Sequence, residues 1–141
     1  MMYILDTNVV SELRKVQAGK ANKNVAAWVQ TIDADDLFLS SITILELELG
    51  VLSRLRKDPV QGAMLRIWLD RQVLPEFAER TLPVDTAVAL RCARLHVPDP
   101  RSERDALIAS TALVHGMTVA TRNMTDFEST GVALLNPWDP S

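Results

Sequence analysis

Four acidic residues stand where an acid is not expected, each at the end of an apolar strand or on the apolar side of a helix: Asp6, Glu46, Asp105 and Asp126. Removing a carboxylate from water is costly unless its charge is compensated. If the four acids converge, a shared divalent cation would compensate them. Carboxylate oxygens favour Mg²⁺ or Mn²⁺ over Zn²⁺, so the pattern predicts a magnesium site suited to hydrolysis of a phosphodiester.

Asp105 and Asp6 each have a structural alternative. Asp105 begins a helical stripe that continues through Ile108 and Ala112, which favours an acid on a buried face. Asp105 also stands three residues after Ser102, as in a capping box at a helix start. Asp6 could equally cap the first helix. The sequence leaves both structural roles open beside the catalytic one.

The other two acids are less defined. Glu46 and Glu48 are two residues apart, about 200° around a helix, so at most one of them can face a pocket beside Asp6. Both have apolar neighbours at helical spacing, and periodicity does not choose between them. Asp126 closes the segment 123–126, whose composition also suits a tight turn.

Polar residues near these acids are candidates to position substrate or water. Thr7 and Asn8 follow Asp6 and could orient its carboxylate or hold a water. The further candidates in the same role are Ser11, Thr121 and Asn123. No paired histidine spacing and no glycine-rich phosphate loop competes with an acidic site.

Composition narrows the class of protein. The 141 residues have the length of one ordinary domain, and a net charge of −3 argues against nonspecific nucleic-acid binding over the whole surface. No apolar run reaches the length of a membrane span. The N-terminus lacks the basic start and long apolar region of a secretion signal, and Cys92 is the single cysteine. We therefore expect a cytoplasmic protein.

Short apolar strands alternate with longer helices. Strands are predicted at residues 3–5, 37–39, 82–84 (or an extended link), 117–121 and 132–135. Helices are predicted at residues 7–14, 25–29, 42–55, 60–74, 86–95 and 103–115, and residues 123–127 as a turn. This alternation predicts an α/β fold, a parallel sheet with helices on both faces. Ligands of such folds gather beyond the carboxyl ends of the strands, where Asp6, Asn123 and Asp126 follow their strands.

Four motifs in order resemble those of PIN-domain ribonucleases, in particular the VapC-type toxins of bacterial toxin–antitoxin pairs and their FitB-like relatives. They are residues 3–12 (YILDTNVVSE), 43–47 (TILEL), 105–109 (DALIA) and 118–127 (TVATRNMTDF). The resemblance covers essentially the whole chain as a single PIN domain, 1–141, and implies a three-layer α/β/α fold with a short central parallel sheet. It selects Glu46 over Glu48. Many relatives have an aspartate where Asn123 stands, so the fourth acid is Asp126 or is replaced by a neutral amide.

The resemblance implies a Mg²⁺-dependent endoribonuclease toxin, with Mn²⁺ able to substitute, that hydrolyses RNA and leaves a 5′-phosphate and a 3′-hydroxyl. Asp6 and Asp105 would hold the principal ion, and Glu46 and Asp126 would bind its waters or a second ion. Alternatives are a weak or inactive PIN-fold interaction module, as Asn123 suggests, and a metal-dependent DNA nuclease or phosphatase that uses the same acids.

The resemblance also implies two protein partners, a small cognate antitoxin and a second copy of the chain in a homodimer or larger toxin–antitoxin assembly. Residues 42–55 contain more leucine and isoleucine than one buried stripe needs, so part of this helix could face a partner chain. The alternative is a central helix that is buried on all sides.

Overall fold

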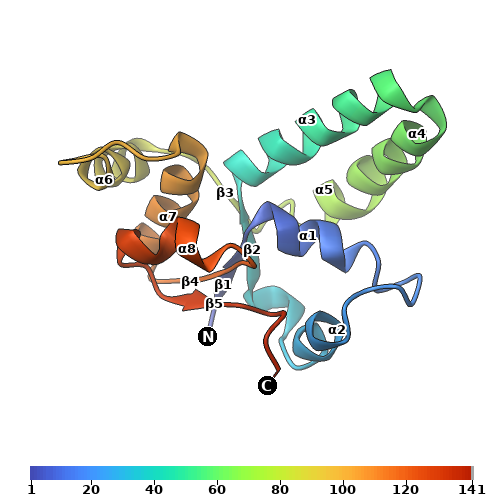
Figure 1. Ribbon diagram of the computed structural model, residues 1–141, viewed down its shortest axis with the longest axis horizontal. Coiled ribbons are helices and arrows are strands. Elements are labelled where there is room, and N and C mark those ends of the chain that lie inside the picture. The colour runs from blue at the N-terminus through green and yellow to red at the C-terminus, as the bar shows by residue number, and fades with distance from the viewer. Residues whose placement is uncertain (141) are drawn as a thin grey trace.

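Five short strands form one sheet in the computed structural model, which describes residues 1–140 (Figure 1). The strands are β1 (Tyr3–Leu5), β2 (Leu37–Ser40), β3 (Thr81–Leu82), β4 (Thr118–Ala120) and β5 (Leu134–Leu135). Their order is β3-β2-β1-β4-β5, and every neighbouring pair is parallel. The predicted parallel sheet is therefore confirmed, with β1 at its centre.

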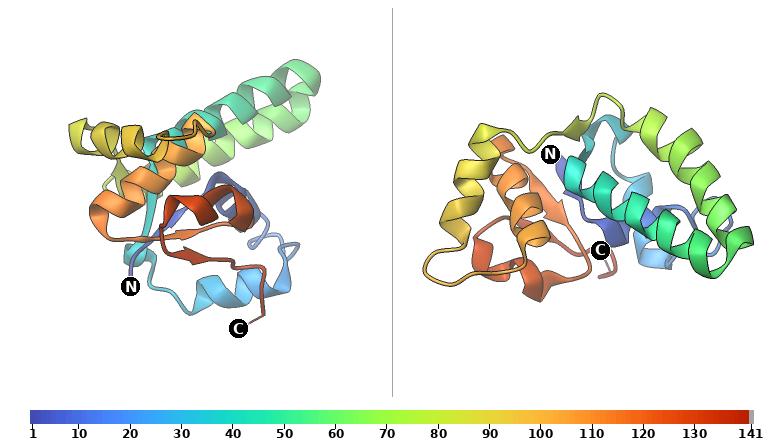
Figure 2. Two further views of the ribbon diagram at one scale, coloured as in Figure 1. Left: turned by 60° about the vertical axis from the view of Figure 1, so that its left-hand side comes forward. Right: turned by 90° about the horizontal axis from the view of Figure 1, so that it is seen from above.

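Helices connect the strands. The α-helices are α1 (Thr7–Leu13), α2 (Lys23–Gln30), α3 (Ser41–Lys57), α4 (Pro59–Trp68), α5 (Leu74–Glu76), α6 (Thr86–Leu95), α7 (Glu103–His115) and α8 (Met124–Phe127). Short 3₁₀ turns occupy Ala34–Asp36 and Glu128–Thr130, and the π-helical segment Leu69–Val73 joins α4 to α5. Helices α3 and α4 pack side by side, as do α6 and α7 (Figure 2). None of the helices described is both long enough and apolar enough to cross a bilayer.

Two hydrophobic clusters lie on opposite faces of the sheet. Side chains alternate along β1, so Tyr3 and Leu5 join one cluster and Ile4 joins the other. The first cluster is covered by α1, α2, α3 and the α4–α5 segment, and the second mainly by α7 with support from α6 and α8. Because helices cover both faces, the predicted three-layer α/β/α architecture is confirmed (Figure 2).

Helix caps lie where the sequence places them. The Ser40 hydroxyl accepts from the N–H of Ile42 (3.0 Å) at the start of α3, and Asp85 caps α6 by accepting from the N–H of Val88 (3.0 Å). Gly116 ends α7 with φ of 67°, a conformation that only glycine adopts without strain.

Several predicted boundaries are wrong. The strand predicted at 82–84 lies at Thr81–Leu82. Residues 123–127 are not a simple turn, because the turn beginning at Asn123 continues into the one-turn helix α8. The last strand is limited to Leu134–Leu135, since only these residues pair with β4. The helix predicted at 60–74 becomes π-helical at 69–73 and extends to Glu76, so Pro75, which has no N–H to donate, lies inside the helical segment.

The strand order creates a crevice at the carboxyl edge of the sheet. The chain leaves β1 for β2 on one side, while β4 lies on the other side, so the connections diverge between β1 and β4. The N–H of Asp6, just beyond β1, donates to the carbonyl of Ala120, the last residue of β4 (2.9 Å). This junction is where side chains following the two strands meet.

Candidate active site

Asp6 lies at the centre of the carboxyl edge and is almost fully buried, with 5% exposure. Its Oδ1 accepts from the N–H of Thr7 (2.8 Å), and its Oδ2 accepts from the Thr121 hydroxyl (2.8 Å) and from Nδ2 of Asn8 (3.2 Å). Asp6 is also the N-cap of α1. The capping role and the site role are therefore compatible, because one oxygen serves the helix and the other faces β4.

Thr121 and Asn8 form a small network around this carboxylate. The buried Thr121 hydroxyl accepts from the N–H of Asn123 (3.0 Å), and the side-chain oxygen of Asn8 accepts from the N–H of Arg122 (3.2 Å). These bonds join the ends of β1 and β4 and fix the orientation of Asp6. Both residues thus orient Asp6 directly.

Glu46 reaches the site from α3. Its Oε1 accepts from the Thr7 hydroxyl (2.6 Å). Because the N–H of Thr7 donates to Asp6, Thr7 bridges the two acids. Glu48 points away and makes two hydrogen bonds with Arg66 on α4, both 2.7 Å long. The structure thus separates two glutamates that their spacing alone does not distinguish.

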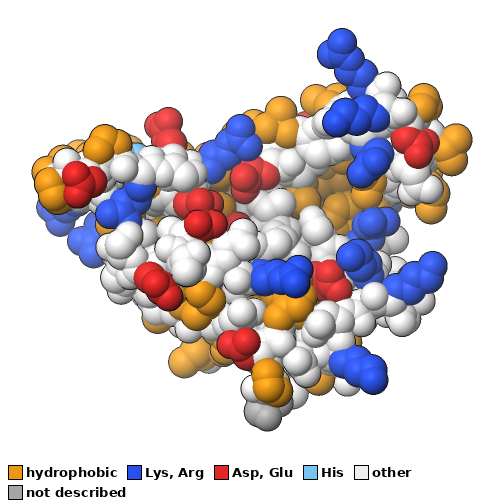
Figure 3. Space-filling model, in the orientation of Figure 1, with side chains coloured by type: hydrophobic (Ala, Val, Ile, Leu, Met, Phe, Trp, Pro, Cys, Tyr) orange, Lys and Arg blue, Asp and Glu red, His pale blue; other side chains and the backbone are white. Residues whose placement is uncertain are grey.

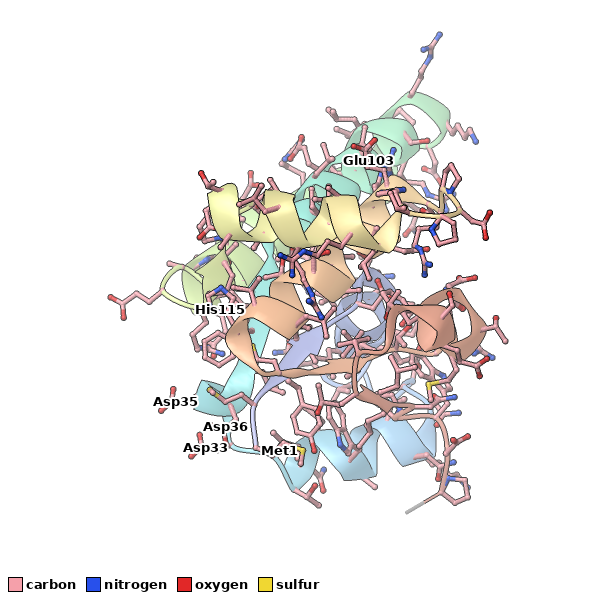
Figure 4. The ribbon with its side chains drawn as sticks, turned by 90° about the vertical axis from the view of Figure 1, so that its left-hand side faces the viewer. Met1, Asp33, Asp35, Asp36, Glu103 and His115 are labelled. Carbon is pink, nitrogen blue, oxygen red and sulfur yellow. The ribbon has the colours of Figure 1, made fainter. Side chains whose placement is uncertain are left out.

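Asp105 lies in the first turn of α7, whose ends are marked by Glu103 and His115 in Figure 4. Ile108 and Ala112 of the same stripe are buried in the core, and Asp105 itself is partly exposed. Ser102 makes no side-chain hydrogen bond to the backbone of α7, so the predicted capping box is absent.

The remaining candidates lie at the rim. Asp126 and Asn123 are exposed, at α8 and just before it, so Asp126 does not belong to a buried surface as the sequence suggested. The Asn123 N–H bonds to Thr121, but its side chain does not cap α8. Ser11 is exposed on α1 and lines a cavity together with Thr7 and Glu46.

The acids affect one another electrostatically. The pKa of Asp105 is raised from 3.8 to about 6, first by burial and then by the negative charges of Asp6, Asp126 and Glu46. Contact with Ser102 opposes this shift. The pKa of Asp6 is also raised, mainly by burial, against the hydrogen bonds from Thr121 and Thr7. The negative charges of Asp6, Glu46 and Asp126 therefore reach Asp105, although the four acids come from four separate segments of the chain.

The donor set suits a hard divalent cation, since the four side chains offer carboxylate oxygens and only Glu46 among them has an ion-pair partner within residues 1–140, the loosely placed Arg104. Within residues 1–140, however, no three histidine, cysteine, aspartate or glutamate side chains are placed closely enough to form a ready metal-binding group. A cation would have to draw the carboxylates together by side-chain rotation, against their repulsion and their present hydrogen bonds.

Residues 3–132 match the family model described as the PIN domain. The chain belongs to the PIN domain family. This PIN domain is 36% identical to the VapC ribonuclease Y4jK of Sinorhizobium fredii, over 99% of this chain and 100% of that protein. It is 38% identical to toxin FitB of Neisseria gonorrhoeae, over 97% and 99%.

The same family relationship holds in three dimensions. The PIN domain superimposes on the crystal structure of FitAcB from Neisseria gonorrhoeae with a TM-score of 0.86 and 37% identity, covering 97% of this chain and 99% of that chain. The superposition covers almost all of both chains, so the resemblance seen in the four motifs extends over the whole fold.

Figure 3 shows the charge distribution on the face that carries the carboxyl edge. Carboxylates gather near its centre, between α7 and the start of α3, and basic side chains lie around the right-hand side, over α1, α3 and α4. The sequence analysis gave no role to Arg104, whose Nη1 lies 3.7 Å from Oε2 of Glu46. Its only sequence signal is that it precedes Asp105.

Proposed function

We propose that this PIN domain is a Mg²⁺-dependent endoribonuclease that acts as the toxin of a toxin–antitoxin pair. The observation that carries the proposal is the placement of Asp6, Glu46 and Asp105 at the carboxyl edge, where Thr7 bonds to both Asp6 and Glu46 and where Glu46 and Asp105 line one cavity. The similarity to a VapC ribonuclease supports RNA as the substrate, and the similarity to toxin FitB supports the role of a toxin.

Asp6 and Asp105 would hold the principal Mg²⁺ or Mn²⁺, with Glu46 and Asp126 beside them. The chemistry that a bound cation supplies is Lewis-acid catalysis, which makes water a better nucleophile and offsets charge on the phosphoryl oxygens. The protein contributes orientation, because Thr121 and Asn8 hold the Asp6 carboxylate and Thr7 holds Glu46.

Substrate would enter through the cavity beside Glu46 that is lined by Thr7, Ser11, Arg54 and Trp68. The Ser11 hydroxyl offers a hydrogen bond to a phosphate oxygen, Arg54 offers a positive charge, and Trp68 offers an apolar ring. Such a lining suits a single-stranded polynucleotide better than a small phosphomonoester. Asn123, next to this edge, would bind water or substrate through its amide.

Cleavage assays test the proposal directly. Purified protein should cleave RNA with Mg²⁺ or Mn²⁺ and not with EDTA, and should cleave DNA and phosphomonoesters far more slowly. Asp6→Ala and Asp105→Ala should abolish cleavage with native circular dichroism, whereas Glu103→Gln in the same first turn of α7 should retain it. Equal cleavage by all variants would identify a contaminating nuclease, and no cleavage by folded wild type would favour the noncatalytic module.

The partners follow from the same relationship. The similarity to toxin FitB and to the FitAcB structure supports a small cognate antitoxin as a partner. Helix α3 is not buried on all sides, since Leu45, Leu49 and Leu52 are 46%, 42% and 51% exposed on one stripe. We assign this stripe to a homodimer or larger assembly. Light scattering of wild type and Leu49→Glu should show loss of the dimer in the variant, and a monomeric wild type would contradict the assignment.

A further inference from the structure

Glu46 separates two cavities. One is the cavity lined by Thr7, Ser11 and Trp68 described above, and the other, of about 560 Å³, lies between the start of α3 and the start of α7. The second cavity, which we call the α3–α7 cavity, is lined by both Glu46 and Asp105 and also by Arg104. A polynucleotide whose reacting phosphate lies at the acids would extend into a cavity on either side.

Arg104 is only loosely held in the α3–α7 cavity. Its Nη1 is 3.7 Å from Oε2 of Glu46, beyond hydrogen-bond distance, and its side chain is 50% exposed. The other oxygen of Glu46 already accepts the short bond from Thr7. Within residues 1–140, Arg104 makes the one ion pair that involves any of the four acids. Its planar group of donors therefore remains available to a ligand.

The local charge favours a phosphate as that ligand. The four acids carry more negative charge than one divalent cation neutralises, so a phosphodiester approaching them is repelled unless a further cation is present. A guanidinium matches two phosphate oxygens at once, and it is desolvated more easily than an ammonium.

We propose that Arg104 binds a backbone phosphate of the RNA in the α3–α7 cavity and thereby positions the neighbouring scissile phosphate over the acids. This inference rests on the proposed ribonuclease function. Arg104 is then a substrate-positioning residue. It would leave Glu46 when substrate binds, since its pairing with that carboxylate, at 3.7 Å, is longer than a hydrogen bond. If Arg104 served only to pair with Glu46, its loss would lower kcat and leave KM unchanged.

The test compares Arg104→Gln, Arg104→Lys and the control Arg94→Gln, which removes an exposed arginine from α6. Steady-state cleavage of a short single-stranded RNA gives KM and kcat for each. Binding of the same RNA, labelled with fluorescein, is measured by anisotropy between 50 and 200 mM salt, roughly the range over which phosphate contacts are resolved. Binding is measured in an Asp105→Asn background, so that RNA stays intact.

We expect Arg104→Gln to raise KM about 10-fold or more with kcat nearly unchanged, and Arg104→Lys to recover part of the loss. The slope of log affinity against log salt should fall by about 0.7, the value for one phosphate of a single strand. Arg94→Gln should match wild type. An unchanged KM and salt slope would overturn the proposal, as would a lower kcat and melting temperature with KM unchanged. If wild type does not cleave RNA, the proposed function fails, and the binding slopes still decide the role of Arg104.

Discussion

Replacing Asp105 with asparagine should stabilise the metal-free protein at neutral pH. The Asp105 pKa rises from 3.8 to about 6 in the folded chain, so folding is opposed by its charge. At face value this shift corresponds to about 3 kcal/mol, and solvent screening at a partly exposed carboxylate lowers it to about 1–2 kcal/mol. Asparagine also loses a favourable interaction with the start of α7, about 0.3–1 kcal/mol. The expected net gain is about 1 kcal/mol.

The stability gained by Asp105→Asn should be present at neutral pH and absent at low pH. Below 3.8 the carboxyl is protonated in both folded and unfolded chains, and the penalty is absent; above about 6 it is charged in both, and the penalty is complete. Asp105→Asn should therefore melt about 3–4 °C above wild type at pH 7.5 in EDTA, and this difference should disappear near pH 4. Differential scanning fluorimetry at both pH values measures it.

The matched control is Glu103→Gln, which removes a neighbouring, exposed carboxylate of the same helical turn. It should leave the melting temperature unchanged or slightly lower. If Asp105→Asn melts at or below wild type at pH 7.5, or if its advantage persists at pH 4, the four acids do not form the crowded site inferred from the structure.

Further predictions address the rest of the site. Added Mg²⁺ should raise the melting temperature of wild type more than that of Asp105→Asn, and equal shifts would indicate binding elsewhere. Glu46→Gln should lower RNA cleavage at least about 100-fold, whereas Glu48→Gln, which loses only its pair with Arg66, should cleave normally. Thr121→Val should destabilise the protein by about 1–3 kcal/mol by removing the hydroxyl bonded to buried Asp6, and Thr121→Ser should restore stability in chemical denaturation.

Several features of the fold follow from local sequence. The apolar residues 3–5 form a buried strand and Asp6 caps the following helix, because strand burial and capping depend on neighbours in the chain. The stripe after Asp105 and the stop at Gly116 are likewise local. The four motifs and the alternation of strands and helices were therefore sufficient to predict the parallel three-layer fold.

The contacts between distant segments were decided only by the tertiary structure. Glu46 and Glu48 have equivalent spacing, and they differ because Thr7 from α1 meets one while Arg66 from α4 meets the other. The burial of an acid likewise depends on which segments pack over it. Asp126 is exposed although its charge still reaches Asp105.

The position of Arg104 beside Glu46 could not be predicted from the sequence. In the sequence it is one more polar residue at a helix start, and nothing in its neighbours indicates a partner on α3. Periodicity describes which face of an element a residue occupies, whereas the identity of the opposite side chain depends on strand order and helix packing. The sequence determined which groups could do the chemistry, and the packing of α3, α7 and β4 around β1 decided which of them meet.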